Sequence, residues 1–283
     1  MALCYTEFNY KRRLTIKRYL KLFARCYVVT FRANTMYKSA FIAGIIGQWL
    51  SYGATYATLY FLTTRFSNLD SWTPSEVLLL YGLSILSYSI AATFFFNPST
   101  NLSGKIRTGE FDSVLTKPLN PFWHEVLLGI NTGYISHITL SVAVIIFALI
   151  NSRFVFTVAN IINLLFVIIG STLIQSASLI ASSVLSFFTL NENPLLDFLV
   201  FNFKEFINYP ITIYPRIIQV LLTFIIPFAY INYYPASFLL GKDIPDGFPF
   251  ILRYLTFFVG ILCFLLSIVL WNWGLKHYKS TGS

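Results

Sequence analysis

The sequence has few charged residues. Only 11% of its 283 residues are Asp, Glu, Lys or Arg, whereas soluble domains carry about 25%. Hydrophobic residues make up 56% of the chain, and the mean hydropathy is +0.68. This composition excludes a soluble globular protein and a disordered one. The chain is therefore predicted to be an integral membrane protein.

Residues that carry chemistry are also scarce. The three cysteines make no disulfide framework, since their number is odd and Cys263 lies in an apolar run. His124, His137 and His277 lack metal-ligand spacing. The stretch 103–106 (Ser-Gly-Lys-Ile) lacks the upstream glycine and the following hydroxyl of a P-loop, and no nucleophile motif occurs. We expect no catalytic residue and no cofactor or metal bound by this chain, which leaves a membrane-embedded enzyme without support.

The long apolar runs lack acidic residues. A proton- or sodium-driven carrier normally keeps an ionisable group within the membrane. Only His137 could have that role, and its neighbours Asn131, Thr132 and Ser136 favour a hydrogen-bonded packing role instead. If the chain transports a substrate, the energy must come from another subunit.

Six uncharged runs are long enough to cross about 30 Å of hydrocarbon as helices. They are Ser39–Leu62, Val77–Phe96, Val126–Ile150, Phe154–Leu190, Ile217–Leu240 and Tyr254–Leu275. The fourth run has 37 residues, and we interpret it as one span over Ile161–Phe187 with an interfacial lead-in. The predicted fold is all-α and polytopic, with six transmembrane helices.

The N-terminal segment is strongly basic, with nine Lys or Arg and one acidic residue in residues 1–38. An apolar stripe recurs at helical spacing, at Ile16, Leu20, Phe23 and Tyr27. Basic residues fall on the opposite side, at Lys17, Arg18, Lys21 and Arg25. This pattern predicts an interfacial amphipathic helix in residues 1–38, ahead of a transmembrane domain in residues 39–283. The helix either only anchors the topology or also contacts a partner. We expect its basic residues to bind membrane lipid and not nucleic acid.

The distribution of basic residues predicts the orientation. With six spans and a cytoplasmic N-terminus, the inner segments hold 16 Lys or Arg and the outer side holds four. Positively charged loops stay on the cytoplasmic side. Both termini are therefore expected in the cytoplasm.

The inner loop between the second and third runs combines apolar and charged residues. The apolar residues Ile106, Phe111, Val114 and Leu115 would form one side of a short interfacial helix. The charged residues Arg107, Glu110, Asp112 and Lys117 would face the cytosol. Pro118 and Pro121 end the helix and return the chain to the bilayer.

This loop resembles that of the ABC type-2 exporter permeases. The matching residues read Ile-Arg-Thr-Gly-Glu-Phe-Asp-x-x-Leu-x-Lys-Pro-Leu-Asn-Pro over 106–121. Stretches 208–215, 226–241 and 271–282 agree as well, so the resemblance covers essentially the whole chain. It implies a six-span permease that pairs with a second permease, more often a related chain than a second copy. Each half would dock a separate ATP-binding subunit that holds ATP and Mg²⁺, in a bacterial inner membrane.

The resemblance also implies roles for particular residues. The ATPase-coupling interface would comprise Ile106, Arg107, Thr108, Gly109, Glu110, Phe111, Asp112, Leu115 and Lys117. Re-entrant outer helices would precede the last span, with Pro227, Tyr233, Tyr234, Pro235 and Leu239 at the gate. Pro227 independently predicts a break, because it removes a helical hydrogen bond.

Polar residues along the fourth run allow two interpretations. Asn163, Ser171, Gln175, Ser178 and Ser182 lie close to one helix face and, with His137, could line an export pathway. Small and hydroxylated residues also let helices pack closely in lipid, and packing is the favoured interpretation.

An autonomous channel or secondary carrier is the alternative to an ABC permease, and it predicts flux through the chain alone. The lack of charge within the spans favours an apolar or amphiphilic cargo over a small ion.

Overall fold

The protein is a helical bundle in a computed structural model that describes residues 16–65, 72–152, 154–189 and 197–280. Every regular element in these ranges is helical. The α-helices are α1 (Ile16–Asn34), α2 (Lys38–Arg65), α3 (Pro74–Arg107), α4 (Glu110–Leu115), α5 (Pro121–Leu128), α6 (Ile135–Ile150), α7 (Val158–Val184), α9 (Arg216–Val220), α10 (Tyr233–Leu240) and α11 (Thr256–Lys276). Short 3₁₀ or π turns are η2 (Thr132–Tyr134), η3 (Leu185–Phe187), η4 (Asp197–Asn202), η5 (Phe203–Asn208), η6 (Ile211–Ile213), η7 (Leu221–Ile225), η8 (Phe228–Tyr230) and η9 (Phe250–Tyr254).

Four helices in the described residues are long and apolar enough to cross a membrane: Pro74–Arg107, Thr132–Ile150, Val158–Phe187 and Thr256–Lys276. A fifth span results if the bent pair Arg216–Ile225 and Phe228–Leu240 counts as one. The predicted first span lies in α2, which has 28 residues but is not among these apolar helices. Its frequent Gly, Ser, Thr and Tyr residues lower its hydropathy. The fold is thus all-helical and multi-pass, with four to five candidate spans where the sequence predicted six.

The third predicted span is interrupted rather than continuous. Helix α5 ends at Leu128, and the chain turns before η2 and α6. The backbone N–H of Asn131 donates to the carbonyl of Thr93 on α3 (2.8 Å), and the Asn131 side chain accepts from Gly133 N–H (2.9 Å). A side chain at Gly129 would collide with the ring of Pro98, so α3 passes directly against this turn. These contacts start a new helix inside an uncharged run.

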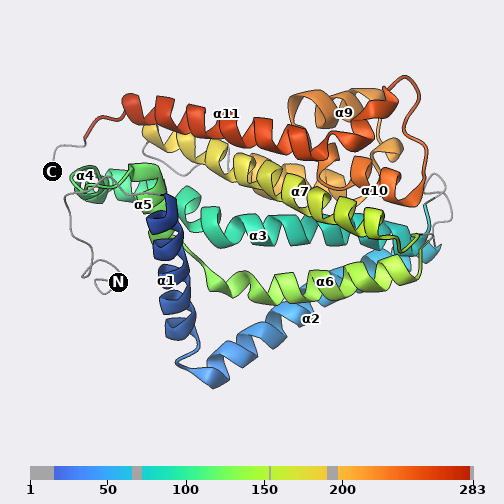
Figure 1. The fold of residues 1–283 in the computed structure, drawn as a ribbon, viewed down its shortest axis with the longest axis horizontal. Helices are drawn as coiled ribbons and strands as arrows, with labels where there is room; N and C mark the ends of the chain where they lie inside the picture. Colours follow the sequence, from blue (N-terminus) through green and yellow to red (C-terminus); the bar gives the residue numbers. More distant parts are fainter. Residues whose placement is uncertain (1–15, 66–71, 153, 190–196, 281–283) are drawn as a thin grey trace.

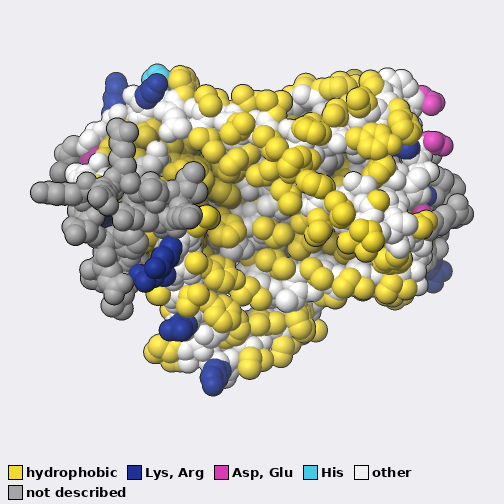
Figure 2. Space-filling model, in the orientation of Figure 1, with side chains coloured by type: hydrophobic (Ala, Val, Ile, Leu, Met, Phe, Trp, Pro, Cys, Tyr) yellow, Lys and Arg dark blue, Asp and Glu magenta, His cyan; other side chains and the backbone are white. Residues whose placement is uncertain are grey.

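Helix α3 occupies the middle of the bundle, between α6 and α2 on one side and α7 and α11 on the other (Figure 1). It is the most deeply buried span, with 89% of its apolar stretch inside the protein, against 22% for α11. Figure 2 shows hydrophobic side chains across the middle of the molecule and charged side chains near its ends. This distribution suits a bundle surrounded by lipid.

Helices α7 and α11 pack backbone to backbone at two glycines. A Cβ atom on Gly170 would lie 2.7 Å from the carbonyl oxygen of Thr256 and 2.8 Å from the Cα of Phe257. A Cβ atom on Gly260 would collide with the carbonyl of Gly170. Small residues permit this close approach of helices in membranes.

Helix α1 crosses the end of the bundle beside α5 (Figure 1). Its buried residues are Leu22 and Cys26, which belong to a small apolar cluster with Leu127 and Ile130. The predicted stripe is displaced, because Leu20 is 64% exposed while Phe23 and Tyr27 are half-buried. The helix packs on α5 along the side that contains Leu22, so protein contact sets its orientation. The side chains of residues 16–18 lie outside the described set.

Candidate functional site

A sharp turn at the end of α3 sets the direction of α4. Helix α3 ends at Arg107, and the N–H of Thr108 donates to the carbonyl of Gly104 (3.0 Å). Gly109 follows with φ +73°, a left-handed conformation that favours glycine. The six residues of α4 begin at once, so the turn is short and leaves little slack between the two helices.

One face of α4 is buried in the bundle. Phe111 is fully buried and Val114 is 4% exposed, next to Ile106 at the end of α3. The ring of Phe111 lies 5.8 Å from that of Phe187 and 5.1 Å from that of Tyr278. Hydrophobic packing therefore holds α4 against η3 and the segment that follows α11.

The opposite face, together with the adjacent turns, is open to solvent. We call it the α4 surface, and it consists of Arg107, Thr108, Glu110, Leu115 and Lys117, all exposed. It carries both signs of charge around one exposed leucine. Five of the nine predicted coupling residues lie here, whereas Ile106 and Phe111 point into the protein and Gly109 forms the turn.

Asp112, the ninth predicted coupling residue, is bound to the C-terminal segment. The hydroxyl of Tyr278 donates to its Oδ1 (2.8 Å), and the hydroxyl of Ser280 donates to its Oδ2 (2.7 Å). The hydrogen bonds from Ser280 and Tyr278 lower the pKa of Asp112. Burial and the neighbouring carboxylate raise the pKa of Tyr278 to about 12. No local pattern in the sequence indicates this contact.

A partly buried ion pair joins the end of α3 to α5. Lys105 Nζ lies 2.7 Å from Glu125 Oε2, and the Glu125 side chain is only 4% exposed. Nδ1 of His124 lies 3.7 Å from the other carboxylate oxygen. Burial opposes the charged form of Glu125, but hydrogen bonds and charges from His124 and Lys105 outweigh it and lower its pKa. Asn120 caps α5 by accepting from the N–H of Phe122 (3.0 Å).

The opposite end of the bundle contains the bent pair. Its two arms, Arg216–Ile225 and Phe228–Leu240, meet at 78° across Pro227. The hydroxyls of Tyr234 and Thr223 are 2.9 Å apart and link the two arms. The other predicted gate residues are also buried here: Tyr233, Pro235 and Leu239. The predicted break is present, and its tyrosines lie inside the protein.

Buried polar side chains fasten this bend to the bundle. Asn232 is fully buried, and its amide donates to the carbonyls of Leu80 on α3 (3.1 Å) and of Ile207. The hydroxyl of Ser171 on α7 donates to the carbonyl of Ile231 (2.6 Å). The Ser171 bond ties the bent pair to α7, and the two Asn232 bonds tie it to α3 and to η5.

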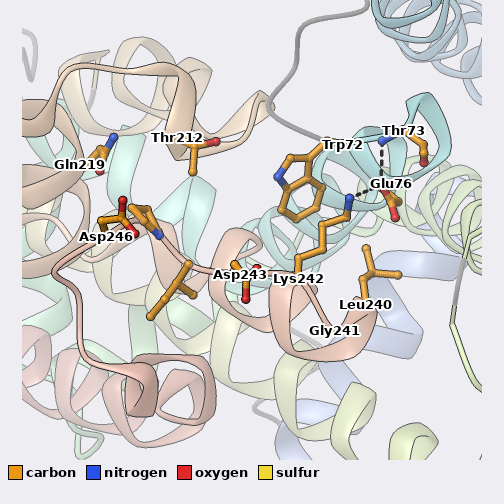
Figure 3. A pocket seen from close by; sticks show the side chains of 12 residues that line it. Trp72, Thr73, Glu76, Thr212, Gln219, Leu240, Gly241, Lys242, Asp243 and Asp246 are labelled. Atoms are coloured by element: carbon orange, nitrogen blue, oxygen red, sulfur yellow. Dashed lines mark hydrogen bonds and ion pairs between the residues drawn. The ribbon is translucent and has the colours of Figure 1, made fainter.

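A polar pocket of about 640 Å³ opens beside the bend. Lys242 Nζ lies 2.8 Å from Glu76 Oε2 and 5.0 Å from the centre of the Trp72 ring. In Figure 3 the Lys242 side chain passes between Trp72 and Glu76. Asp243 and Asp246 also line the pocket. Glu76 lies in the first turn of α3, where its carboxylate also accepts from Thr73 N–H (2.7 Å).

The residues predicted to line a pathway are mostly buried among helices. Gln175, Ser178 and Ser182 on α7 are at most 8% exposed, and Ser182 donates to the carbonyl of Leu179 (2.8 Å). Asn163 is half-buried. None of the six predicted residues lines the 640 Å³ pocket.

His137 lies on α6, where its environment is aromatic and polar. Its ring centre is 4.3 Å from that of Tyr52 on α2, and its Nδ1 is 3.3 Å from the hydroxyl of Ser136. The contact with Tyr52 joins α6 to α2, and the contact with Ser136 lies within α6. Within the described residues, no group of three or more His, Cys, Asp or Glu could hold a metal ion.

The bundle of apolar helices, broken element and short charged helix define a multi-pass membrane protein. The chain belongs to the ABC-2 family transporter proteins, whose family model matches residues 50–282. It is therefore a transmembrane subunit of an ABC transporter. Neither a curated protein nor a solved structure matches the chain.

Proposed function

We propose that this chain is the permease subunit of an ATP-driven exporter and that a separate ATP-binding subunit docks on the α4 surface. The observation that carries the proposal is the two-sided character of α4. One side is fixed by Phe111 and Val114, and the other exposes charges of both signs. Such a helix can bind a partner and move with the bundle at the same time.

The contacts around α4 support transmission of a displacement. A push on α4 reaches α3 through the short Gly109 turn and reaches α5 because Lys105 pairs with Glu125. Helix α3 then runs through the centre of the bundle to the pocket end, where Glu76 holds Lys242. ATP and Mg²⁺ would bind in the partner, and ATP-driven closure there would switch the permease between inward- and outward-facing states.

The proposal includes six spans, with α2 as the first. This helix is 28 residues long, about 42 Å, which exceeds the hydrocarbon thickness. Much of its apolar surface is exposed in the single chain, including Ile46, Leu50 and Phe61. Lipid and a second permease, more often a related chain than a second copy, would cover this surface. Both termini would then lie in the cytoplasm of a bacterial cell, with the chain in the inner membrane.

Charge reversal on the α4 surface tests the coupling role. In the double variant Arg107→Glu, Glu110→Lys, we expect normal insertion and an unchanged thermal midpoint, because both side chains are exposed. Recovery of the ATP-binding subunit in a mild-detergent pull-down should fall by about tenfold or more, since like charges would face each other across the interface. The control is Arg65→Glu, an exposed reversal at the end of α2.

The same pull-down separates the alternatives. An ATP-binding subunit recovered with the wild-type chain but lost with the double variant supports the proposal. Unchanged recovery with the double variant would refute the docking surface. If the wild-type chain is recovered alone and conducts a flux in liposomes that depends on His137, the chain is an autonomous channel or carrier.

A further inference from the structure

The segment after α11 folds back onto α4. Its two hydroxyls occupy both oxygens of one carboxylate, since Tyr278 bonds Oδ1 and Ser280 bonds Oδ2 of Asp112 (2.8 and 2.7 Å). The ring of Tyr278 also packs on Phe111 (5.1 Å) and lies near Phe187 (6.4 Å). Polar and apolar contacts therefore meet on the same turn of α4.

Helix α4 depends on such contacts for its position. It has only six residues, far fewer than an isolated helix needs to persist in water. Its N-terminal neighbour Gly109 has no side chain to cap it, and no side-chain cap bond is present there. Contacts with the rest of the protein must hold the helix, and among the described residues Asp112 supplies polar contacts of this kind.

We propose that Tyr278 and Ser280 are positioning residues that clamp Asp112, so that the C-terminal segment holds α4 in its docking orientation. The clamp joins α4 to the segment that follows α11. Asp112 therefore binds the protein's own C-terminal segment and does not contact the ATP-binding subunit. The docking part rests on the proposed function, whereas the clamp itself does not.

The clamp gives α4 a second mechanical connection. The first connection is covalent, through Gly109 to α3. The second runs through Asp112 and Tyr278 to α11, which contacts α7 at Gly260. A displacement of α4 would thus reach both the central helix and the α7–α11 pair.

Hydrogen exchange on the full chain in lipid nanodiscs tests the clamp without any partner. We expect Tyr278→Phe and Asp112→Ala each to speed exchange of the α4 amides by about threefold or more, because the first removes one of the two hydrogen bonds to Asp112 and the second removes both. The double variant should exceed the larger single effect only slightly, since both changes remove one interaction. Ser113→Ala is the matched control. Ser113 donates only to the carbonyl of Glu110 in its own helix (2.8 Å).

A second measurement addresses positioning. With the ATP-binding subunit present, Tyr278→Phe should weaken its recovery with the permease while the thermal midpoint of the permease stays the same. A merely structural role would lower the midpoint instead. Unchanged α4 exchange in both single variants, or additive effects in the double variant, would overturn the clamp. Failure of the wild-type chain to recover an ATP-binding subunit would refute the proposed function and leave the exchange result standing.

Discussion

The two ends of the bundle use polar residues differently. At the α4 end, Arg107, Glu110 and Lys117 are exposed, and the short helix is held by contacts between side chains, such as Asp112 with Tyr278. At the α10 end, Asn232 and Ser171 are buried and bind backbone carbonyls. Side-chain contacts at a surface exchange readily with solvent or a partner, whereas buried bonds to the backbone resist displacement. The α4 end is thus suited to docking, and the α10 end to holding a broken helix in place.

The largest effect is expected at the α10 end, from the largely buried ion pair at the pocket. Glu76→Gln removes the carboxylate next to Lys242, whose side chain is only 14% exposed. We expect a loss of about 3 kcal/mol in stability, because removing one partner of a largely buried ion pair is strongly destabilising. Thermal unfolding in detergent measures this loss of stability. The double variant Glu76→Gln, Lys242→Met should lose less than the single variant, and an equal or larger loss would show that the pair is not coupled.

Asn232→Ala should have the next largest effect. The change leaves the carbonyls of Leu80 and Ile207 without the amide that binds them. The expected cost is about 2 kcal/mol. Asn272→Ala is the matched control, because Asn272 is exposed and binds only the carbonyl of Ile268 in its own helix (2.9 Å). Equal destabilisation by the two variants would contradict the special role of the bend.

The smallest effect is expected at the α4 end, from Glu125. Its pKa in the folded protein lies below its ordinary value of 4.5. The carboxylate therefore adds stability that is complete above pH 4.5 and is lost as the pH falls through the lower folded value. We expect Glu125→Gln to cost about 1 kcal/mol near neutral pH and to remove this acid dependence. Thermal midpoints of the wild-type protein and of the Glu125→Gln variant, measured between neutral and strongly acidic pH, check this prediction. Parallel pH profiles for the two proteins would refute it.

Local patterns in the sequence predict a large part of the fold. Uncharged runs identify the long helices α3, α7 and α11, because burial in lipid requires continuous apolar stretches. Pro227 identifies the bend through its missing N–H. Apolar residues around Phe111 identify the buried side of α4. In each case the signal lies within a few turns of the structure that it specifies.

The features that local sequence patterns do not predict depend on contacts between residues far apart in the chain. Lys242 meets Glu76, and Tyr278 meets Asp112, across most of the chain. The turn at Asn131 depends on the carbonyl of Thr93 on another helix, so an uncharged run gives no sign of it. Leu20 is exposed because α1 packs on α5 through Leu22, which periodicity alone does not decide.

The glycine contact between α7 and α11 limits how the protein can change shape. Where two backbones touch, no flexible side chains lie between them to absorb sliding along the helix axes. The crossing at Gly170 and Gly260 fixes the separation of the two backbones at this point, and Gly274 near the other end of α11 lies close against Val184 and Phe187. With close approaches near both ends of α11, α7 and α11 are expected to move together as one unit when the protein changes state.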